Sequence, residues 1–409
     1  MKKFLVATLG CRTNQYESQA YSDQLKNLGF LPAQEGERAD LCIVNTCTVT
    51  HSADSSSKHQ IRELLRAHPE AEIVVTGCMT ESSPDAIVAL GDRVRLVPNR
   101  SKEELVQILF PEEEELPEFQ IQTFDERTRA FVKVQDGCNS FCTYCIIPYV
   151  RGRSRSRQIG DVVEEVKGLA ASGFKEVVIT GINVGDFDGG GTLADLVRAI
   201  DGIQEIQRIR ISSIDPDEID ENLTDAVLNG RATCPSMHVV LQAGSNVILK
   251  RMNRKYSRQI FLETIEKLAL KNPDFTVTTD IIVGFPGETE LDFVDTLDVV
   301  KQVKFAKVHL FPYSPRKRTR AALYPNQVPA AIVKQRKAEL MRLAEKMAYE
   351  LRERFVGRTM SVLTERGNFG HTANFLPVMI ESSAQCAPNE IASCQLIANS
   401  PEGLIGRLV

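Results

Sequence analysis

The sequence predicts an α/β fold: a small N-terminal parallel sheet, a central partial TIM-type barrel of six strand–helix units, and a C-terminal small β-barrel. Three observations lead to this class. Apolar runs of strand length alternate with helix-like stretches over residues 1–110. The same alternation returns over residues 129–311, and short strand-like runs replace it after Gly357. Strand–helix alternation is typical of parallel sheets, and successive short strands are typical of small barrels.

Residues 1–112 are expected to form the N-terminal α/β domain. The predicted strands are Lys3–Leu9, Leu41–Asn45, Glu72–Thr76 and Val94–Val97, and the predicted helices are Glu17–Leu28, Ser55–Ala67 and Ser101–Phe110. Cys11, Cys47 and Cys78 each stand where a predicted strand ends, which is where α/β sheets place ligand sites. An acidic stretch between prolines, residues 111–117, indicates a solvated linker.

Residues 129–350 are expected to form the partial barrel. Its predicted strands are Ala130–Gln135, Glu176–Thr180, Arg208–Ser213, His238–Gln242, Thr276–Val283 and Lys307–Phe311. The helices predicted between them are Gly160–Ser172, Thr192–Ala199, Ser257–Lys271 and Glu290–Val300. Barrels of this kind carry their chemistry at the carboxyl ends of the strands.

Residues 354–409 are expected to form the C-terminal β domain, after a packing helix within residues 329–355. Apolar residues recur at helical spacing in that helix, which favours packing over ligand binding. The strands predicted beyond it are Met360–Thr364, Ala373–Ile380, Glu390–Ala398 and Leu404–Val409. Their shortness favours a small barrel.

Composition limits the class of protein. The ten cysteines stand in a chain of 409 residues in which we expect neither a signal peptide nor a transmembrane segment. We therefore expect a cytoplasmic protein whose thiols bind metal or take part in catalysis, rather than a disulfide scaffold. The net charge of −5 argues weakly against a nucleic-acid partner, although binding depends on local patches more than on totals.

The central motif is a CxxxCxxC triad formed by Cys138, Cys142 and Cys145. Three thiolates in a short loop can bind three irons of a cubane cluster and leave the fourth iron open. The amino and carboxylate groups of S-adenosylmethionine can chelate such an open iron. Structural zinc is the alternative, but it usually takes four ligands with paired CxxC spacing. The triad therefore favours an iron–sulfur cluster.

The N-terminal cysteines are a weaker signal when taken alone. Cys11, Cys47 and Cys78 are widely separated, and dispersed cysteines are often simply buried. Their positions at three successive strand ends, beside glycine and polar residues, favour a second set of three cluster ligands. On spacing alone both interpretations stay open.

Together these motifs resemble a known family. The CxxxCxxC triad with Tyr144 before its last cysteine is typical of the radical S-adenosylmethionine superfamily. The order Gly10-Cys11, Asn45-Thr46-Cys47 and Gly77-Cys78, followed by that triad, is similar to the methylthiotransferases within it. The similarity extends to residues 148–154, 210–213, 241–245 and 280–288 and so spans most of the chain.

The resemblance implies cofactors, partners and a division of labour. It implies two 4Fe-4S clusters, an auxiliary one on Cys11, Cys47 and Cys78 and a radical-generating one on the CxxxCxxC triad. One S-adenosylmethionine would methylate sulfur held at the auxiliary cluster, and another would supply the radical that activates carbon. Electrons would come from a flavodoxin or ferredoxin type of donor, while the sulfur donor is unknown. The C-terminal strands stand where the family carries an RNA-binding TRAM module.

Members of the family differ in substrate. The stretches that begin at Cys11-Arg12-Thr13-Asn14 and at Asn45 look most like the group that acts on N6-threonylcarbamoyladenosine at position 37 of tRNA. The resemblance thus implies methylthiolation of carbon 2 of that base. The alternatives are isopentenyl-adenosine in tRNA and an aspartate of a ribosomal protein. Two non-catalytic alternatives also stay open: an iron–sulfur carrier, and an RNA-binding protein with structural zinc.

Further site residues follow from the resemblance and from charge. By analogy with the family, the cofactor contacts are Tyr144, Thr180, Gly181, Ser212, Gln242 and Asp280. Two basic clusters predict phosphate contacts with the anticodon loop of tRNA, because arginine suits phosphate geometry. They comprise Arg151, Arg153, Arg155 and Arg157, and Arg316, Lys317 and Arg318.

Overall fold

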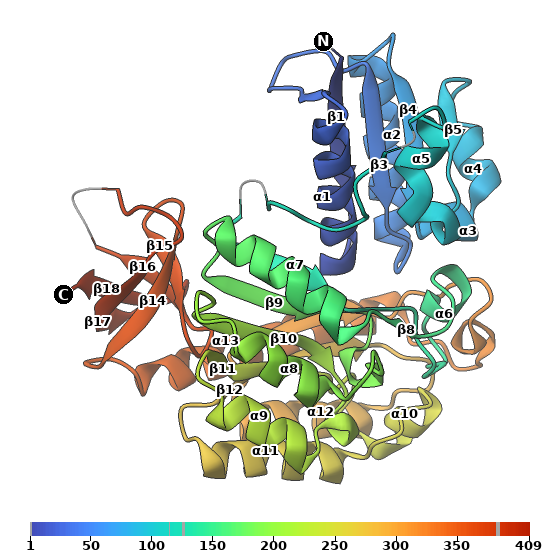
Figure 1. Cartoon of the computed structure of the whole chain (residues 1–409). Coiled ribbons are helices and arrows are strands. Elements are labelled where there is room, and N and C mark those ends of the chain that lie inside the picture. Colours follow the sequence, from blue (N-terminus) through green and yellow to red (C-terminus); the bar gives the residue numbers. More distant parts are fainter. Residues whose placement is uncertain (1, 114, 125–126, 382–384) are drawn as a thin grey trace.

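The computed structural model describes residues 2–113, 115–124, 127–381 and 385–409. The predicted acidic linker therefore contains one residue, Glu114, that lies outside the described part. Three large sheets organise the described residues in the predicted order, and Figure 1 shows them as the blue N-terminal part, the green-to-orange curved sheet and the red C-terminal barrel. A small two-stranded sheet pairs β7 (Gln135–Asp136) with β8 (Arg155–Ser156). The predicted fold class is confirmed.

The N-terminal sheet has five parallel strands in the order β2-β1-β3-β4-β5. The strands are β1 (Lys3–Thr8), β2 (Leu31–Pro32), β3 (Leu41–Thr46), β4 (Glu72–Gly77) and β5 (Val94–Leu96). The helices are α1 (Arg12–Asn27), α2 (His51–Ala67), α3 (Met79–Ser82), α4 (Pro84–Val88) and α5 (Leu105–Leu109), with a 3-10 turn over Asn99–Glu104. The apolar strands β3 and β4 are buried almost throughout, as expected between two covering layers.

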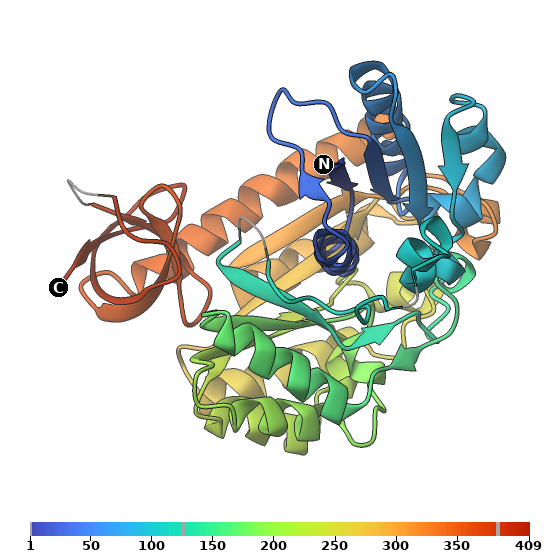
Figure 2. The same cartoon turned by 45° about the horizontal axis from the view of Figure 1, so that its top comes forward.

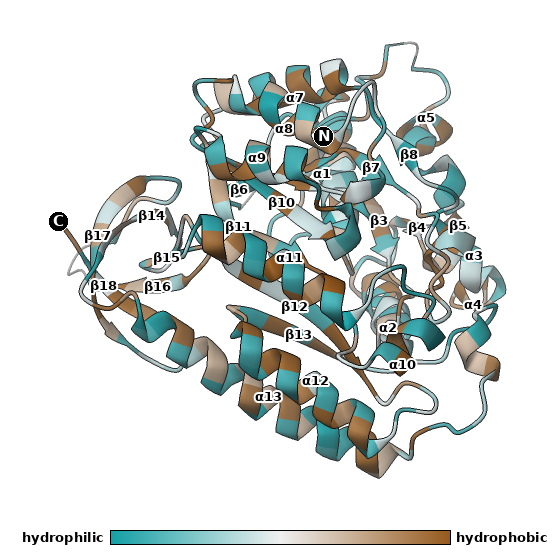
Figure 3. Cartoon of the chain, turned by 90° about the horizontal axis from the view of Figure 1, so that it is seen from below, coloured by the Kyte–Doolittle hydropathy of each residue, from teal (hydrophilic) through white to brown (hydrophobic). Residues whose placement is uncertain are grey.

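The central sheet has six parallel strands in the order β13-β12-β11-β10-β9-β6. They are β6 (Arg129–Lys133), β9 (Glu176–Thr180), β10 (Arg208–Ile214), β11 (Thr233–Val239), β12 (Thr276–Val283) and β13 (Lys307–Pro312). The covering helices are α7 (Ile159–Ala171), α8 (Leu193–Asp201), α9 (Glu221–Asn229), α11 (Arg258–Lys271), α12 (Glu290–Val303) and α13 (Ala330–Glu353). Figure 3 shows apolar and polar residues alternating along α11, α12 and α13, as expected for helices with one face on a sheet.

The curved sheet is a half-barrel whose concave side faces the N-terminal domain (Figure 2). Helix α1 joins the two cores. Its Tyr16 and Ala20 belong to the apolar core of the half-barrel, whereas Tyr21 and Leu25 belong to that of the N-terminal sheet. The hydroxyl of Tyr16 also donates to Glu165 of α7 at 2.8 Å. This shared helix fixes the N-terminal strand ends over the mouth of the half-barrel.

The C-terminal strands close into a barrel in the order β14-β15-β16-β18-β17. They are β14 (Thr359–Glu365), β15 (Phe369–Thr372), β16 (Pro377–Ile380), β17 (Ile391–Asn399) and β18 (Leu404–Leu408). Arginines of β10 anchor the barrel: Arg208 donates to the carbonyl of His371 at 2.9 Å, and Arg210 donates to that of Ala373 at 2.8 Å. The barrel therefore sits at the amino ends of the half-barrel strands.

Two predicted strands differ from the observed ones. The strand predicted at His238–Gln242 is β11, which runs earlier, and Gln242 instead has a left-handed φ of 63°. The predicted strand Ala373–Ile380 is broken by a turn in which Asn374 is buried and Phe375 has a φ of 63°. Helix α9 and the short α10 (Asn246–Arg251) were not predicted. Within the described ranges, no helix is both long and apolar enough to cross a membrane.

Candidate active site

The three N-terminal cysteines meet at the carboxyl edge of the N-terminal sheet. Cys11 precedes α1, Cys47 follows β3 and Cys78 follows β4. Gly10 shows how closely they approach, because a Cβ built on it would lie 2.8 Å from the Sγ of Cys47. Gly10 also has a φ of 95°, which favours glycine. Parallel strands thus bring together thiols that are far apart in the sequence.

These thiols interact electrostatically. Burial, followed by the neighbouring Cys78, raises the pKa of Cys47 to about 12. Burial also raises the pKa of the Cys78 thiol, while Arg151 and Lys102 act in the opposite direction. Cys47 and Cys78 are buried, whereas Cys11 is exposed. Buried thiolates need positive charge nearby, and iron supplies it. The donor set therefore fits a metal cluster.

Arg151 lies beneath this thiol group and links it to the half-barrel. Its Nε donates to the Sγ of Cys78 at 3.3 Å, and its Nη1 donates to Glu17 at 3.1 Å and to Asp136 at 2.8 Å. Lys102 adds a second cation, 2.6 Å from Glu17. Although burial opposes ionisation, Arg151 and Lys102 lower the pKa of Glu17 to about 2. The predicted role of Arg151 in tRNA binding is wrong, because this guanidinium is buried among its partners.

Two more of the predicted tRNA contacts are also engaged inside the protein. Arg316 is buried and donates to Thr48 at 2.8 Å and to Asp54 at 2.7 Å, so its predicted tRNA contact is wrong as well. Arg157 is half-buried and donates to the hydroxyl of Tyr16 and to Glu165. These partners leave the Arg157 guanidinium little capacity for a phosphate. The remaining four predicted residues are exposed: Arg153, Arg155, Lys317 and Arg318.

The CxxxCxxC triad lies on the loop after β7 (Gln135–Asp136), at the mouth of the half-barrel, and leads into α6 (Ile147–Val150). The backbone N–H of Ser140 donates to the Sγ of Cys138 at 3.4 Å. Arg254 donates to the Sγ of Cys142 at 2.9 Å and also pairs with Asp215. No sequence pattern marks Arg254 as a site residue, because its partners Cys142 and Asp215 lie far from it along the chain.

Burial, followed by the neighbouring Cys142, raises the pKa of Cys145 to about 12. Within the described residues, no three His, Cys, Asp or Glu side chains converge on one point as the ligands of a single ion do. In a cubane each thiolate binds a different iron, so the ligands stand around the cluster rather than around one atom. Each triad offers the donors that one such cluster needs.

Three of the predicted cofactor contacts come together beside the triad. Tyr144, Gln242 and Asp280 line one pocket with Cys145. The Oε1 of Gln242 is buried and has no hydrogen-bond partner among the described residues. The Oγ of Ser212, also predicted as a contact, is likewise buried and has no hydrogen-bond partner among the described residues. Buried polar atoms without partners are costly, so these two atoms fit a polar ligand such as S-adenosylmethionine.

The other two predicted contacts lie at the end of β9. Thr180 is buried, and its carbonyl accepts from Val134 at 2.9 Å. Gly181 packs against Gln135, because a Cβ there would lie 2.9 Å from the Gln135 Oε1. Gln135 itself was not predicted as a site residue. Its Nε2 donates to the carbonyl of Gly137 at 2.8 Å, so it holds the start of the cysteine loop against β9.

Comparisons with known proteins agree with this geometry. Residues 132–300 match the radical SAM superfamily, and residues 3–98 match a family described as uncharacterized protein family UPF0004. Among solved structures, the radical S-adenosylmethionine methyltransferase TsrM from Kitasatospora setae aligns with a TM-score of 0.58 and 15% identity, covering 79% of this chain and 77% of that one. The cobalamin-dependent radical enzyme OxsB aligns with a TM-score of 0.54 and 10% identity, covering 86% and 58%. These likenesses support the fold.

Sequence relatives are more specific. The threonylcarbamoyladenosine tRNA methylthiotransferase MtaB of Chlamydia pneumoniae is 48% identical, over 99% of this chain and 98% of the relative. The MtaB of Bacillus subtilis is 34% identical, over 92% and 90%. The tRNA-2-methylthio-N(6)-dimethylallyladenosine synthase of Desulfitobacterium hafniense is 34% identical, over 89% and 86%. The chain belongs to the radical S-adenosylmethionine methylthiotransferase family, whose cofactors are iron–sulfur clusters and S-adenosylmethionine.

Proposed function

We propose that this enzyme methylthiolates carbon 2 of N6-threonylcarbamoyladenosine at position 37 of tRNA. The base identity is supported by the activity for which the relative that is 48% identical over nearly the whole chain is named. The observation that carries the chemistry is the presence of two cysteine triads, which the buried Arg151 links through its contacts with Cys78 and Asp136. Methylthiolation requires one site to activate carbon and another to deliver sulfur.

The two triads are proposed to hold different clusters. Cys11, Cys47 and Cys78 would hold the auxiliary cluster. The CxxxCxxC triad would hold the cluster that binds S-adenosylmethionine and, when loaded, supplies the radical. Tyr144, Gln242 and Asp280 would border that cofactor, because they line the pocket beside the triad. Thr180, Gly181 and Ser212 would support it from the ends of β9 and β10.

The exposed basic residues are proposed to contact the tRNA backbone. Arg153, Arg155, Lys317 and Arg318 offer guanidinium and ammonium groups at the surface, which suit phosphate oxygens. We propose three domains: the N-terminal domain (1–112), the radical core (129–350) and a TRAM-like domain (354–409). The TRAM-like domain contains the closed C-terminal barrel. We further propose a cytoplasmic enzyme that receives electrons from a flavodoxin or ferredoxin type of protein.

Mass spectrometry of tRNA nucleosides tests the substrate. A strain that lacks this chain should accumulate N6-threonylcarbamoyladenosine and lose its 2-methylthio derivative. Expression of the wild-type chain should restore the derivative, whereas a Cys142→Ala chain should not. An unchanged amount of 2-methylthio-N6-threonylcarbamoyladenosine in the deletion strain would contradict the proposal.

A second candidate substrate is N6-dimethylallyladenosine of tRNA. It is supported by the relative from Desulfitobacterium hafniense that is named for that activity and is 34% identical over 89% of this chain. The same nucleoside profile separates the two candidates, because the deletion would then remove the 2-methylthio derivative of dimethylallyladenosine instead.

A further inference from the structure

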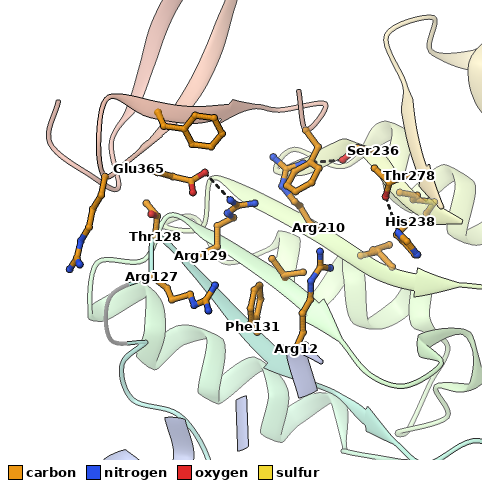
Figure 4. A pocket seen from close by; sticks show the side chains of 16 residues that line it. Arg12, Arg127, Thr128, Arg129, Phe131, Arg210, Ser236, His238, Thr278 and Glu365 are labelled. Atoms are coloured by element: carbon orange, nitrogen blue, oxygen red, sulfur yellow. Dashed lines mark hydrogen bonds and ion pairs between the residues drawn. The ribbon is translucent and has the colours of Figure 1, made fainter. Parts of the chain in front are cut away.

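A cavity of about 410 Å³ opens on the concave face of the half-barrel, between its strands and the C-terminal barrel. Figure 4 shows arginines from several elements pointing into it. Five arginines line it, namely Arg12, Arg127, Arg129, Arg210 and Arg366, and among its described lining residues one carboxylate, Glu365, opposes them. The cavity is therefore strongly positive and suits an anionic ligand.

The two inner arginines from the half-barrel strands are already neutralised. Arg129 pairs with Glu365 at 2.8 Å, and Arg210 pairs with Glu176 at 2.7 Å. Arg12 differs from both. Within the described part of the chain its guanidinium has no hydrogen bond or ion pair, and it lies over the ring of Phe131, with its central carbon 5.6 Å from the ring centroid. A half-buried guanidinium of this kind is available for an anion that enters the cavity.

Aromatic rings accompany this free cation. Phe131 lies under Arg12, and Phe375 of the C-terminal barrel has Arg210 over its ring at 4.8 Å. Both phenylalanines line the cavity. Aromatic side chains and arginine planes are the surfaces on which splayed bases stack. The cavity thus combines aromatic rings with unpaired positive charge. Arg127 and Arg366 also line it without an ion pair among the described residues, but both are exposed, whereas Arg12 is half-buried.

The cavity also borders residues that adjoin each thiol group. At one side, Arg12 follows Cys11 directly in the chain. At the other side, the Nε2 of His238 lies 3.4 Å from Asp280, which lines the pocket beside Cys145. A base bound in this cavity would therefore lie near residues that adjoin both thiol groups.

We infer that Arg12 binds the carboxylate of the threonylcarbamoyl group and so selects an adenosine that carries a carboxylate. The inference rests on the proposed function and assigns to Arg12 the recognition of the substrate base. Guanidinium and carboxylate match in geometry and charge, so Arg12 acts as a specificity residue. A backbone phosphate is the other anion that Arg12 could meet, and the experiment distinguishes the two sources.

The test measures binding of anticodon stem-loops to the anaerobically reconstituted full chain. Three stem-loops are used, carrying N6-threonylcarbamoyladenosine, its carboxylate methyl ester, or unmodified adenosine. The wild-type chain should bind the first roughly 10- to 100-fold more tightly than the ester, the size of effect expected of a charge-assisted hydrogen bond. Equal binding of acid and ester would overturn the inference without any variant.

Variants sharpen the test. Arg12→Gln should remove the preference for the acid over the ester and leave binding of the unmodified stem-loop unchanged, whereas Arg12→Lys should keep part of the preference. If Arg12 met a phosphate instead, Arg12→Gln would weaken all three stem-loops equally and overturn the inference. Arg153→Gln, at an exposed arginine, is the control that should weaken all three equally.

Because Arg12 adjoins Cys11, iron and sulfide are measured in every variant. If Arg12→Gln loses iron, the ester comparison on the wild-type chain still decides the inference. Failure of the proposed function has a different signature: the wild-type chain would not methylthiolate tRNA that carries N6-threonylcarbamoyladenosine. Methylthiolation of that tRNA together with equal binding of acid and ester would overturn the inference alone.

Discussion

The Nε of Arg151 donates a hydrogen bond to the Sγ of Cys78 at 3.3 Å, across the boundary between the half-barrel and the N-terminal sheet. The same guanidinium donates to Asp136, two residues before Cys138. One buried side chain therefore touches a thiol of the first triad and the strand that leads to the second. This relationship fixes the spacing of the two thiol groups.

Replacement of Arg151 by Met should destabilise the chain and release iron from the N-terminal triad. The change leaves Glu17 and Asp136 buried with one cation fewer, and breaking a buried ion pair costs about 3–5 kcal/mol. Iron should fall from about eight toward about four atoms per chain. Urea unfolding and iron analysis measure both effects. Arg153→Met, at an exposed neighbour, should change neither, and an Arg151→Met chain with full iron and stability would contradict the assigned role.

Replacement of Arg254 by Gln should make the cluster on the CxxxCxxC triad harder to reduce. Hydrogen bonds to the ligand sulfurs are among the factors that set cluster potentials, and Arg254 brings positive charge to Cys142 at 2.9 Å. We expect a more negative midpoint potential in an EPR redox titration and slower formation of 5′-deoxyadenosine. Lys255→Gln, at the exposed next residue, should match the wild type in both measurements. An unchanged potential in Arg254→Gln would show that this contact does not tune the cluster.

The cysteine ligands could be read from the sequence because local patterns mark them. Cys47 and Cys78 directly follow apolar runs that form β3 and β4, and parallel strands align their carboxyl ends. The role of Arg151 could not be read in this way. Its partners Glu17 and Asp136 come from separate elements, and an Arg-rich stretch looks the same whether its members face solvent or a buried carboxylate.

The start of strand β11 could not be predicted from local sequence patterns either. Its first half carries Thr233, Pro235 and Ser236, which give no apolar run, so the predicted strand began at His238. Tertiary contacts explain the polar content, because the hydroxyl of Ser236 accepts a hydrogen bond from Arg210 at 2.9 Å. Side chains that face a polar cavity remove the periodicity on which sequence interpretation depends.

Replacement of Glu218 by Gln should flatten the dependence of stability on pH. Burial, followed by the nearby Asp215, raises the pKa of Glu218 from its ordinary 4.5 to about 7. The folded chain therefore holds a proton that the unfolded chain has lost, so the free energy of unfolding falls as pH rises through this range. Thermal unfolding at several pH values measures the slope. Glu266→Gln, on the exposed face of α11, should keep the wild-type slope, and an equal slope in Glu218→Gln would refute the assignment.

Replacement of Gly10 by Ala should prevent the N-terminal thiols from holding their iron–sulfur cluster, whereas Gly29→Ala should leave that cluster in place. Both glycines have positive φ angles, 95° and 80°, so both substitutions carry a similar backbone penalty of about 1–2 kcal/mol. They differ in surroundings, because a Cβ at Gly10 would lie 2.8 Å from the Sγ of Cys47, while a Cβ at Gly29 meets nothing within 4 Å. Iron analysis and methylthiolation of tRNA compare them. Equal iron in both variants would mean that Gly10 is needed for the turn alone.

Replacement of single cysteines should separate cleavage of S-adenosylmethionine from methylthiolation of tRNA. Cys142→Ala should abolish formation of 5′-deoxyadenosine and, with it, methylthiolation, because the triad then lacks one thiolate for the cluster that binds S-adenosylmethionine. Cys47→Ala should stop methylthiolation but leave some cleavage of S-adenosylmethionine, because Tyr144, Gln242 and Asp280 still line the pocket beside Cys145. Each variant should bind about four irons.

Cys234→Ala is the matched control for these two variants. Cys234 is buried in β11, away from both triads, so its loss should cost some stability but no iron. Liquid chromatography of 5′-deoxyadenosine and nucleoside mass spectrometry give the two readouts. Full methylthiolation by Cys47→Ala would refute the two-cluster assignment. Loss of cofactor cleavage in both cysteine variants would instead show that the N-terminal thiols are needed to assemble the radical site, as the contact of Arg151 with Cys78 allows.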